Sequence, residues 1–140
     1  MKFVLDTCVL SELVKPAPDA GLLAWMEAAD EAGLHLSVIT VGEIRQGVAA
    51  LADSRRKQEL DRWLRQDLVQ RFAERLLPFG LDEADRWGRL RGEAQRSGAP
   101  VPAVDAMLAA TALCHGLKLV TRNVQDFARL PVGIENPWAG

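Results

Sequence analysis

Phe3-Val4-Leu5-Asp6-Thr7, near the start of the chain, is the stretch that decides the fold. Its three apolar residues are enough for a short buried strand, and an acidic residue follows that strand at once. Three later places are similar, because a polar side chain stands where a strand ends or a helix opens. In open α/β sheets, ligands bind at the carboxyl ends of the strands. We therefore expect one edge of a sheet to gather four polar groups: Asp6, Glu43, Asp105 and Asn123.

Three of these four groups are carboxylates, which repel one another when they converge. At about 4 Å and an effective dielectric constant of about 20, each pair of unit charges costs on the order of 4 kcal/mol. A hard divalent cation removes this cost, because Mg²⁺ and Mn²⁺ take oxygen ligands. The sequence therefore predicts a metal site at Asp6, Glu43 and Asp105, and hydrolytic chemistry.

Short apolar or β-branched runs alternate along the chain with longer segments whose apolar residues recur at helical spacing. We expect strands at residues 2–5, 34–39, 76–79 and 117–120, with an edge strand near 132–135. We expect helices at residues 11–14, 21–32, 41–51, 55–75, 82–96 and 102–115. This alternation is typical of a mainly parallel sheet with helices on both faces. The expected fold is α/β: a three-layer α/β/α sandwich with a mainly parallel sheet of four or five strands, in which residues 1–140 form a single domain.

The composition argues against several classes of protein. Hydrophobic residues make up 49% of the chain and charged residues 26%, which is ordinary for a soluble protein. No apolar run reaches the roughly 18 residues of a membrane span, and the N-terminus does not resemble a signal peptide, so we expect a cytoplasmic protein. Two cysteines and two histidines do not suggest a disulfide framework or a zinc cluster. A net charge of −2 does not itself indicate nucleic-acid binding, and it leaves the substrate open.

Each candidate residue also has a structural interpretation. Asp6 is a suitable helix cap, and Thr40-Val41-Gly42-Glu43 matches the capping box, in which the glutamate returns to the cap amide. Asn123 suits a turn and Asp126 suits a cap. Asp105 is different, because residues 102–111 are otherwise small or apolar. The free-energy cost of burying an unpartnered charge exceeds the stabilisation that the helix dipole gives to an aspartate in the first turn. Asp105 is therefore the strongest indication of a functional site.

Four ordered segments resemble those of PIN-domain ribonucleases, specifically the VapC-type toxins of bacterial toxin–antitoxin pairs and their FitB-like branch. The matching segments are residues 3–12, 36–47, 105–112 and 120–127, and the ending Asn136-Pro137-Trp138 is similar as well. The resemblance spans the whole chain. It implies a PIN-like fold and a Mg²⁺- or Mn²⁺-dependent endoribonuclease toxin that hydrolyses RNA phosphodiester bonds.

The resemblance also implies roles for individual residues. Asp6, Glu43 and Asp105 match the family's metal ligands, and the family has a fourth acidic residue where this chain has Asn123 and then Asp126. We expect Asn123 to act through water and Thr7 to orient water or a ligand. We expect Thr121, Arg122 and Asp126 to contact either the residues that hold the metal or the substrate. Cys8 stands where the family more usually has asparagine.

The partners that the resemblance implies are an RNA substrate, a cognate antitoxin and a second copy of the chain in a homodimer. In this family a C-terminal segment of the antitoxin covers the acidic pocket. We expect Leu22, Trp25 and Met26 to form a hydrophobic groove for it.

Three other functions stay open. One is a PIN scaffold that binds without cutting. Another is a phosphatase of the haloacid-dehalogenase type, although that mechanism needs a second aspartate two residues after the first, where this chain has Cys8. The third is a receiver-like signalling domain, although paired acids after the first strand and a late strand-end lysine are missing from the sequence.

Overall fold

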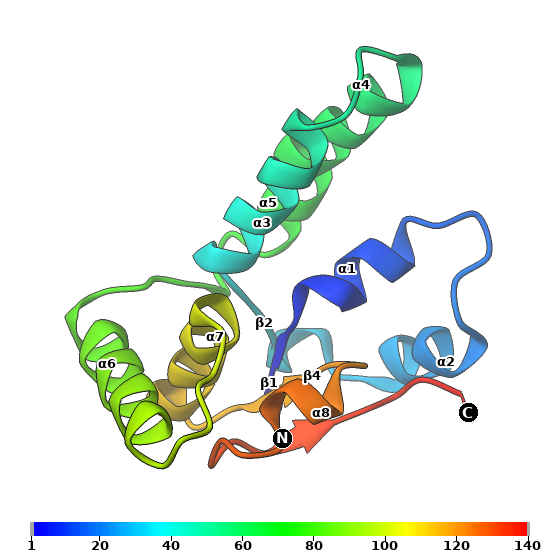
Figure 1. Ribbon diagram of the computed structural model, residues 1–140. Helices are drawn as coiled ribbons and strands as arrows, with labels where there is room; N and C mark the ends of the chain where they lie inside the picture. Colours follow the sequence, from blue (N-terminus) through cyan, green and yellow to red (C-terminus); the bar gives the residue numbers. More distant parts are fainter. Residues whose placement is uncertain (1, 140) are drawn as a thin grey trace.

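The computed structural model describes residues 2–139, and its centre is a sheet of parallel strands (Figure 1). The sheet order is β3-β2-β1-β4-β5, so the first strand of the chain is the middle one. Phe3 pairs with Leu34 on one side and with Lys118 on the other. Every pairing is parallel, which confirms the expected topology and brings the carboxyl ends of all five strands to one edge. The strands are β1 (Phe3–Leu5), β2 (Leu34–Ser37), β3 (Leu76–Leu77), β4 (Lys118–Val120) and β5 (Ile134–Glu135).

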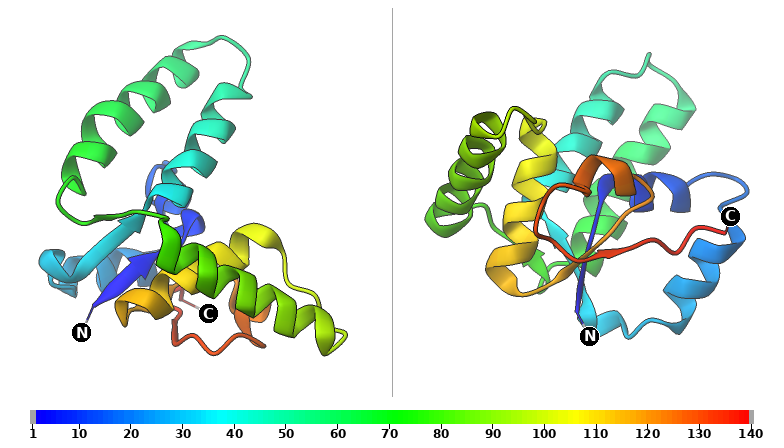
Figure 2. Two further views of the ribbon diagram at one scale, coloured as in Figure 1. Left: turned by 90° about the vertical axis from the view of Figure 1, so that its left-hand side faces the viewer. Right: turned by 60° about the horizontal axis from the view of Figure 1, so that its bottom comes forward.

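Side chains of the central strands alternate between two hydrophobic cores, one on each face of the sheet. Val4 and Leu119 belong to the core beneath α6 (Leu81–Arg96) and α7 (Ala103–His115). Leu5 and Val120 belong to the other core, covered by α1 (Thr7–Leu13), α2 (Ala20–Ala28) and α3 (Val38–Ala49). The two views of Figure 2 show these helix layers on either side of the strands. The expected three-layer α/β/α sandwich is confirmed.

A helical arm projects from this body (Figure 1). It consists of α3, α4 (Arg55–Arg62), a six-residue π-helical segment η2 (Trp63–Leu68) and α5 (Val69–Arg71). The prediction of one regular helix over residues 55–75 is therefore wrong in detail. A π turn contains more residues than an α turn and occurs mainly as a local bulge within an α-helix, which apolar spacing alone does not reveal.

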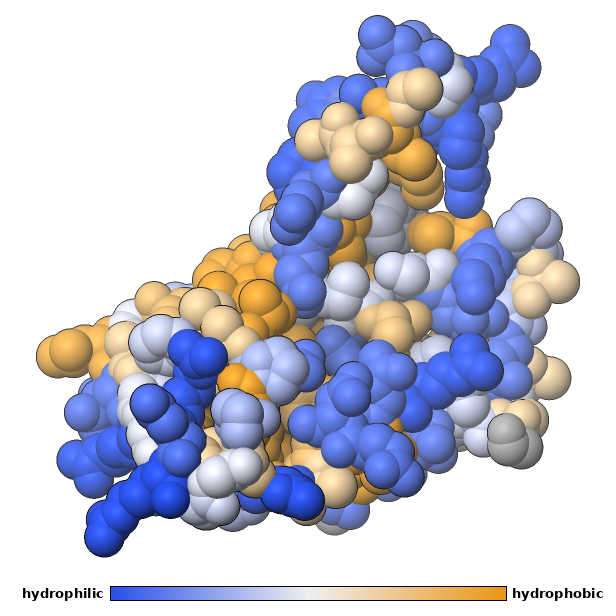
Figure 3. Space-filling view, viewed as in Figure 1, coloured by the Kyte–Doolittle hydropathy of each residue, from blue (hydrophilic) through white to orange (hydrophobic). Residues whose placement is uncertain are grey.

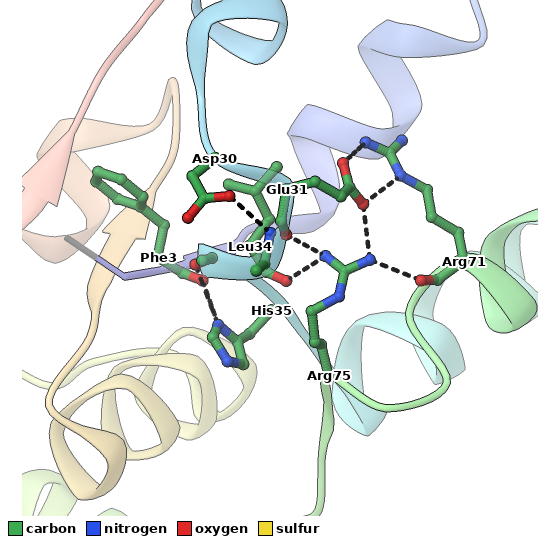
Figure 4. A network of polar contacts seen from close by, with 9 residues as sticks. Phe3, Asp30, Glu31, Leu34, His35, Arg71 and Arg75 are labelled. Carbon is green, nitrogen blue, oxygen red and sulfur yellow. Dashed lines mark hydrogen bonds and ion pairs between the residues drawn. The ribbon is translucent and has the colours of Figure 1, made fainter.

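The base of the arm is fastened to the body by a charged network around Glu31, in the short 3-10 helix η1 (Glu31–Gly33) (Figure 4). Arg71 donates to the Glu31 carboxylate through Nε at 2.9 Å and Nη2 at 2.7 Å. Arg75 donates to the same carboxylate at 2.7 Å and to the backbone carbonyl of Leu34, also at 2.7 Å. The hydrogen bond from Arg71 is the main reason that the pKa of Glu31 falls to about 2; burial opposes this shift, and Arg75 adds to it.

Several predicted helix and strand boundaries are corrected. Helix α1 begins at Thr7 and not at Ser11, because Asp6 caps it directly. The predicted helix 21–32 is α2, which ends at Ala28, followed by η1. β3 ends at Leu77, before Pro78. These differences leave the order of the elements unchanged.

The C-terminal residues cross from β5 to α2 (Figure 1). The Ala139 amide donates to Asp19 Oδ2 at 3.0 Å, and Trp138 packs against the core on that side. A Cβ atom at Gly21 would lie 2.6 Å from the Ala139 nitrogen and 2.7 Å from the Pro137 carbonyl oxygen. Glycine at position 21 therefore lets the tail lie directly on the start of α2. Within residues 2–139, no helix is both long enough and apolar enough to cross a membrane.

Candidate active site

Asp6 occupies the carboxyl end of the central strand and is buried. Its Oδ1 accepts the Thr7 backbone N–H at 2.7 Å, and its Oδ2 accepts the Thr121 hydroxyl at 2.8 Å. Its own N–H donates to the carbonyl of Val120 at 2.9 Å. Asp6 is thus both the cap of α1 and a fixed carboxylate at the sheet edge, so its two possible roles do not exclude each other.

Glu43 reaches the same edge from α3, and the capping-box interpretation of it is wrong. The cap of α3 is Ser37, whose hydroxyl accepts the Ile39 N–H at 3.0 Å, while Thr40 lies fully buried inside the helix. The helix starts earlier than expected because β2 ends at Ser37. Glu43 is consequently free of the cap, and its Oε1 accepts the Thr7 hydroxyl at 2.6 Å. Thr7 therefore links the end of β1 to α3.

Asp105 lies in the first turn of α7, as expected. Burial raises the pKa of its carboxyl to about 6, with further contributions from the negative charges of Asp126, Asp6 and Glu43, in that order. The three predicted ligands are therefore brought within electrostatic reach of one another. Asp126, which sequence reasoning ranked behind Asn123, has the largest effect among these charges.

Thr121 joins the end of β4 to Asp6. Its side chain is fully buried, and its hydroxyl donates to Asp6 while accepting the Asn123 backbone N–H at 2.9 Å. Asn123 itself is exposed and precedes the short helix α8 (Val124–Phe127) without a side-chain cap hydrogen bond. Asp126 lies in the first turn of α8. One hydroxyl thus connects the Asp6 carboxylate to the segment that carries both candidates for the fourth polar group.

The donor set suits a hard cation better than a soft one, because the converging groups are carboxylate and hydroxyl oxygens. Within residues 2–139, however, no group of three His, Cys, Asp or Glu side chains is so arranged that it could hold an ion as it stands. The negative charges of Asp126, Asp6 and Glu43 act on Asp105, but the carboxylates do not form a closed cage. Charge coupling and donor chemistry fit a divalent ion that keeps several waters, as Mg²⁺ does.

Two further polar residues of α1, Cys8 and Glu12, are not among the predicted site residues. The Cys8 thiol lies 3.6 Å from Asp6 Oδ2 and 3.6 Å from the Thr121 hydroxyl oxygen. Burial, then the Asp6 charge, raises the pKa of this thiol, so it acts as a weak donor to the carboxylate. Glu12, one turn further along α1, is also buried. Its position in an otherwise mostly apolar helix was the available signal.

A groove leads away from the acidic edge between α1 and the arm. It has a volume of about 210 Å³ and begins at Thr7 and Glu43. In Figure 3, hydrophobic colour follows the side of the arm that faces α1, whereas the tip of the arm is hydrophilic. Arg56 spans the groove's outer end and donates to the Val14 carbonyl at 3.1 Å. The apolar lining consists of Val14, Ile44, Val48, Leu51, Leu60 and Trp63.

The groove expected from Leu22, Trp25 and Met26 is not found in that form. Leu22 is fully buried, and Trp25 packs edge-on against Phe3 with ring centroids 5.0 Å apart. Only Met26 lines a surface hollow, on the other side of Val14 and Trp63 from the groove. Helix α2 turns its apolar side to the core, so the usable groove is formed by the arm.

Comparisons with known proteins agree with this architecture. Residues 3–133 match the PIN domain family. The chain is 39% identical over 135 residues to VapC ribonuclease Y4jK of Sinorhizobium fredii, covering 96% of both chains. It superposes on the crystal structure of FitAcB from Neisseria gonorrhoeae with a TM-score of 0.91, 36% identity and 99% coverage of each chain. A toxin–antitoxin complex from Klebsiella pneumoniae gives a TM-score of 0.75 at 27% identity, covering 99% of this chain and 100% of that one. By its sequence and its fold, the chain belongs to the PIN domain family.

Proposed function

We propose that this protein is a Mg²⁺- or Mn²⁺-dependent endoribonuclease that acts in the cytoplasm as the toxin of a toxin–antitoxin pair. The observation that carries the proposal is the electrostatic coupling of Asp6, Glu43 and Asp105 at one edge of a PIN-domain sheet. The ribonuclease activity is inferred from the similarity to a VapC ribonuclease. PIN-domain VapC nucleases are metal-dependent as a class.

Asp6, Glu43 and Asp105 are the residues that would hold the metal. When bound, such a cation lowers the pKa of a water and stabilises negative charge on the phosphate. The chain's own contribution is to position the carboxylates. Thr7 holds Asp6 through its amide and Glu43 through its hydroxyl, and Thr121 holds the other oxygen of Asp6. Fixed carboxylate orientations keep the reacting groups aligned, which is how second-shell hydrogen bonds support metal sites.

Asp126 is the better candidate for the fourth acidic group. Its charge leads those that raise the pKa of Asp105, whereas Asn123 is neutral and its side chain makes no cap bond. A carboxylate also binds Mg²⁺ more strongly than an amide does. We therefore assign the electrostatic role to Asp126 and a water-mediated contact to Asn123.

The groove beside the site is proposed to receive the antitoxin. Its apolar walls fit an amphipathic helix, a common mode of peptide recognition. At its inner end lies Glu43, where an arginine or lysine of the antitoxin would compete with the metal for the carboxylates. A toxin homodimer would present two such grooves to the antitoxin.

The decisive experiment is cleavage of a structured RNA by the purified protein with Mg²⁺, Mn²⁺ or EDTA. The variants Asp6→Asn, Glu43→Gln and Asp105→Asn are each expected to lower the cleavage rate at least about 100-fold while remaining folded. Asp53→Asn and Glu74→Gln remove the same charges from exposed positions and serve as matched controls. Cleavage that persists in EDTA, or in all three variants, would contradict the proposal. A folded wild-type protein that binds RNA without cutting it would indicate an inactive scaffold.

A further inference from the structure

Helix α1 has two functional sides. Thr7 and Ser11 line the groove toward the arm. Cys8 and Glu12, also one turn apart, lie on another side, where the Cys8 thiol approaches Thr121. The groove and the Thr121-Arg122 turn are therefore separated by the helix itself, and a ligand on the second side need not occupy the groove.

Glu12 organises cations on this second side. Its buried carboxylate accepts Lys15 Nζ at 2.9 Å and the Asp19 backbone N–H at 3.0 Å. Lys15 remains 58% exposed at its side chain, so most of it is accessible to a ligand. The hydrogen bond from Lys15 is the main reason that the pKa of Glu12 lies below its usual value, and the Arg122 charge adds to it. Arg122 directly follows Thr121, which the Cys8 thiol approaches, so it lies on this same side of α1.

Arg122 connects this region to the catalytic edge. It is exposed, and it directly follows Thr121, whose hydroxyl holds Asp6. Its charge also contributes to the low pKa of Asp19, behind the larger effect of backbone amides such as that of Ala139. Arg122 therefore lies beside the acidic site, and Lys15, bound to Glu12, lies further along the same side of α1.

The acidic site creates an electrostatic difficulty for an RNA substrate. Without a metal, Asp6, Glu43, Asp105 and Asp126 repel a phosphate chain, and the whole protein has a net charge of −2. Affinity for nucleic-acid strands comes largely from cationic side chains that contact phosphates, and these contacts also set the strand's position. Cations next to the carboxylates are therefore needed where the strand enters or leaves.

We propose that Lys15, held by the buried carboxylate of Glu12, and Arg122, next to Thr121, form a phosphate-binding pair for the RNA strand. Together they would bind phosphates of the strand where it leaves the acidic site. This inference rests on the proposed ribonuclease function. It names residues that would position the RNA strand at the site.

Binding without cleavage tests the pair directly. The full-length protein is titrated, in EDTA, into a fluorescently labelled single-stranded oligoribonucleotide over a series of salt concentrations, and anisotropy is recorded. Lys15→Gln and Arg122→Gln are each expected to weaken binding about threefold to fivefold. Each should also reduce the slope of log K against log salt by about 0.7, the value for one lost contact to a single strand. Arg122→Lys should retain the wild-type slope.

Arg89→Gln is the matched control. Arg89 is an exposed residue of α6, paired with Asp85 at 3.0 Å, on the opposite face of the sheet. Thermal melting of every variant checks the fold, and Lys15→Arg keeps the cation if Lys15→Gln proves unstable. If the wild-type protein cleaves RNA while both glutamine variants bind with the wild-type slope, the phosphate-binding pair is refuted and the ribonuclease proposal stands. If the wild-type protein neither binds nor cleaves RNA, both proposals fail.

Discussion

Replacing Asp105 by asparagine tests the electrostatics of the site without any nuclease assay. The carboxyl has a pKa of about 6 in the folded protein against an ordinary value of 3.8. At 1.36 kcal/mol per pH unit, this difference corresponds to about 3 kcal/mol. Because the side chain is partly exposed and therefore screened, we expect on the order of 1–2 kcal/mol. In metal-free protein at pH 7.5, Asp105→Asn should thus be the more stable form, by about 3–6 °C in melting temperature.

The sign of the pH dependence follows from the raised pKa. The protonated carboxyl is the favoured form in the folded state, so its contribution is complete below pH 3.8 and is lost as the pH rises through about 6. The stability difference between variant and wild type should therefore be near zero at about pH 4 and reach its full size above about pH 7.

Urea denaturation in EDTA at several pH values measures this difference. Asp53→Asn is the control, since its carboxylate is fully exposed and distant in sequence from the site. Equal differences for Asp105→Asn at pH 4.5 and pH 7.5 would show that ionisation is not the cause. A variant less stable than wild type at pH 7.5 would refute the electrostatic reasoning altogether.

Three further predictions concern the supports of the site. Glu31→Gln should lower the free energy of unfolding by about 1 kcal/mol at pH 7, a value reduced because the ion pair is partly exposed. Because the pKa of Glu31 is depressed to about 2 in the folded protein, urea denaturation should show this loss disappearing as the pH falls through about 2. Thr121→Val should raise the Mn²⁺ concentration needed for half-maximal RNA cleavage, whereas Thr121→Ser should restore the wild-type value; identical metal curves would contradict the role of its hydroxyl. Asp126→Ala should slow cleavage more than Asn123→Ala does, and the reverse order would return the fourth position to Asn123.

Two positions of the candidate site could be predicted from the sequence, because Asp6 is tied to a strand end and Asp105 to a helix start. Asp6 directly follows β1, and Asp105 opens a helix with few other charges, so burial and topology could be inferred together. Parallel pairing then brings these positions to one edge. No knowledge of side-chain packing was needed for that step.

Features that depend on tertiary packing could not be predicted in the same way. Val38 and Ile39 are β-branched and favour a strand, yet they begin α3, because the sheet ends at Ser37. That shift of the helix start removed the capping box and released Glu43 toward Thr7. The groove was misplaced because it requires the relative position of α1 and the arm, which no local pattern encodes. The fourth acidic group needed spatial information as well, since Asn123 and Asp126 are three residues apart.

The π-helical segment Trp63–Leu68 bears on how the arm tolerates a change in its length. Leu60, Leu64, Leu68 and Phe72 recur at intervals of four, and in a regular α-helix such a row winds gradually around the axis. The wider π turns offset this winding, so the row can face the body along its whole length. A π bulge of this kind amounts to one extra residue inserted into an α-helix without moving its flanks. Removing one residue from this segment should therefore convert it to a regular α-helix while Arg71 and Arg75 still meet Glu31.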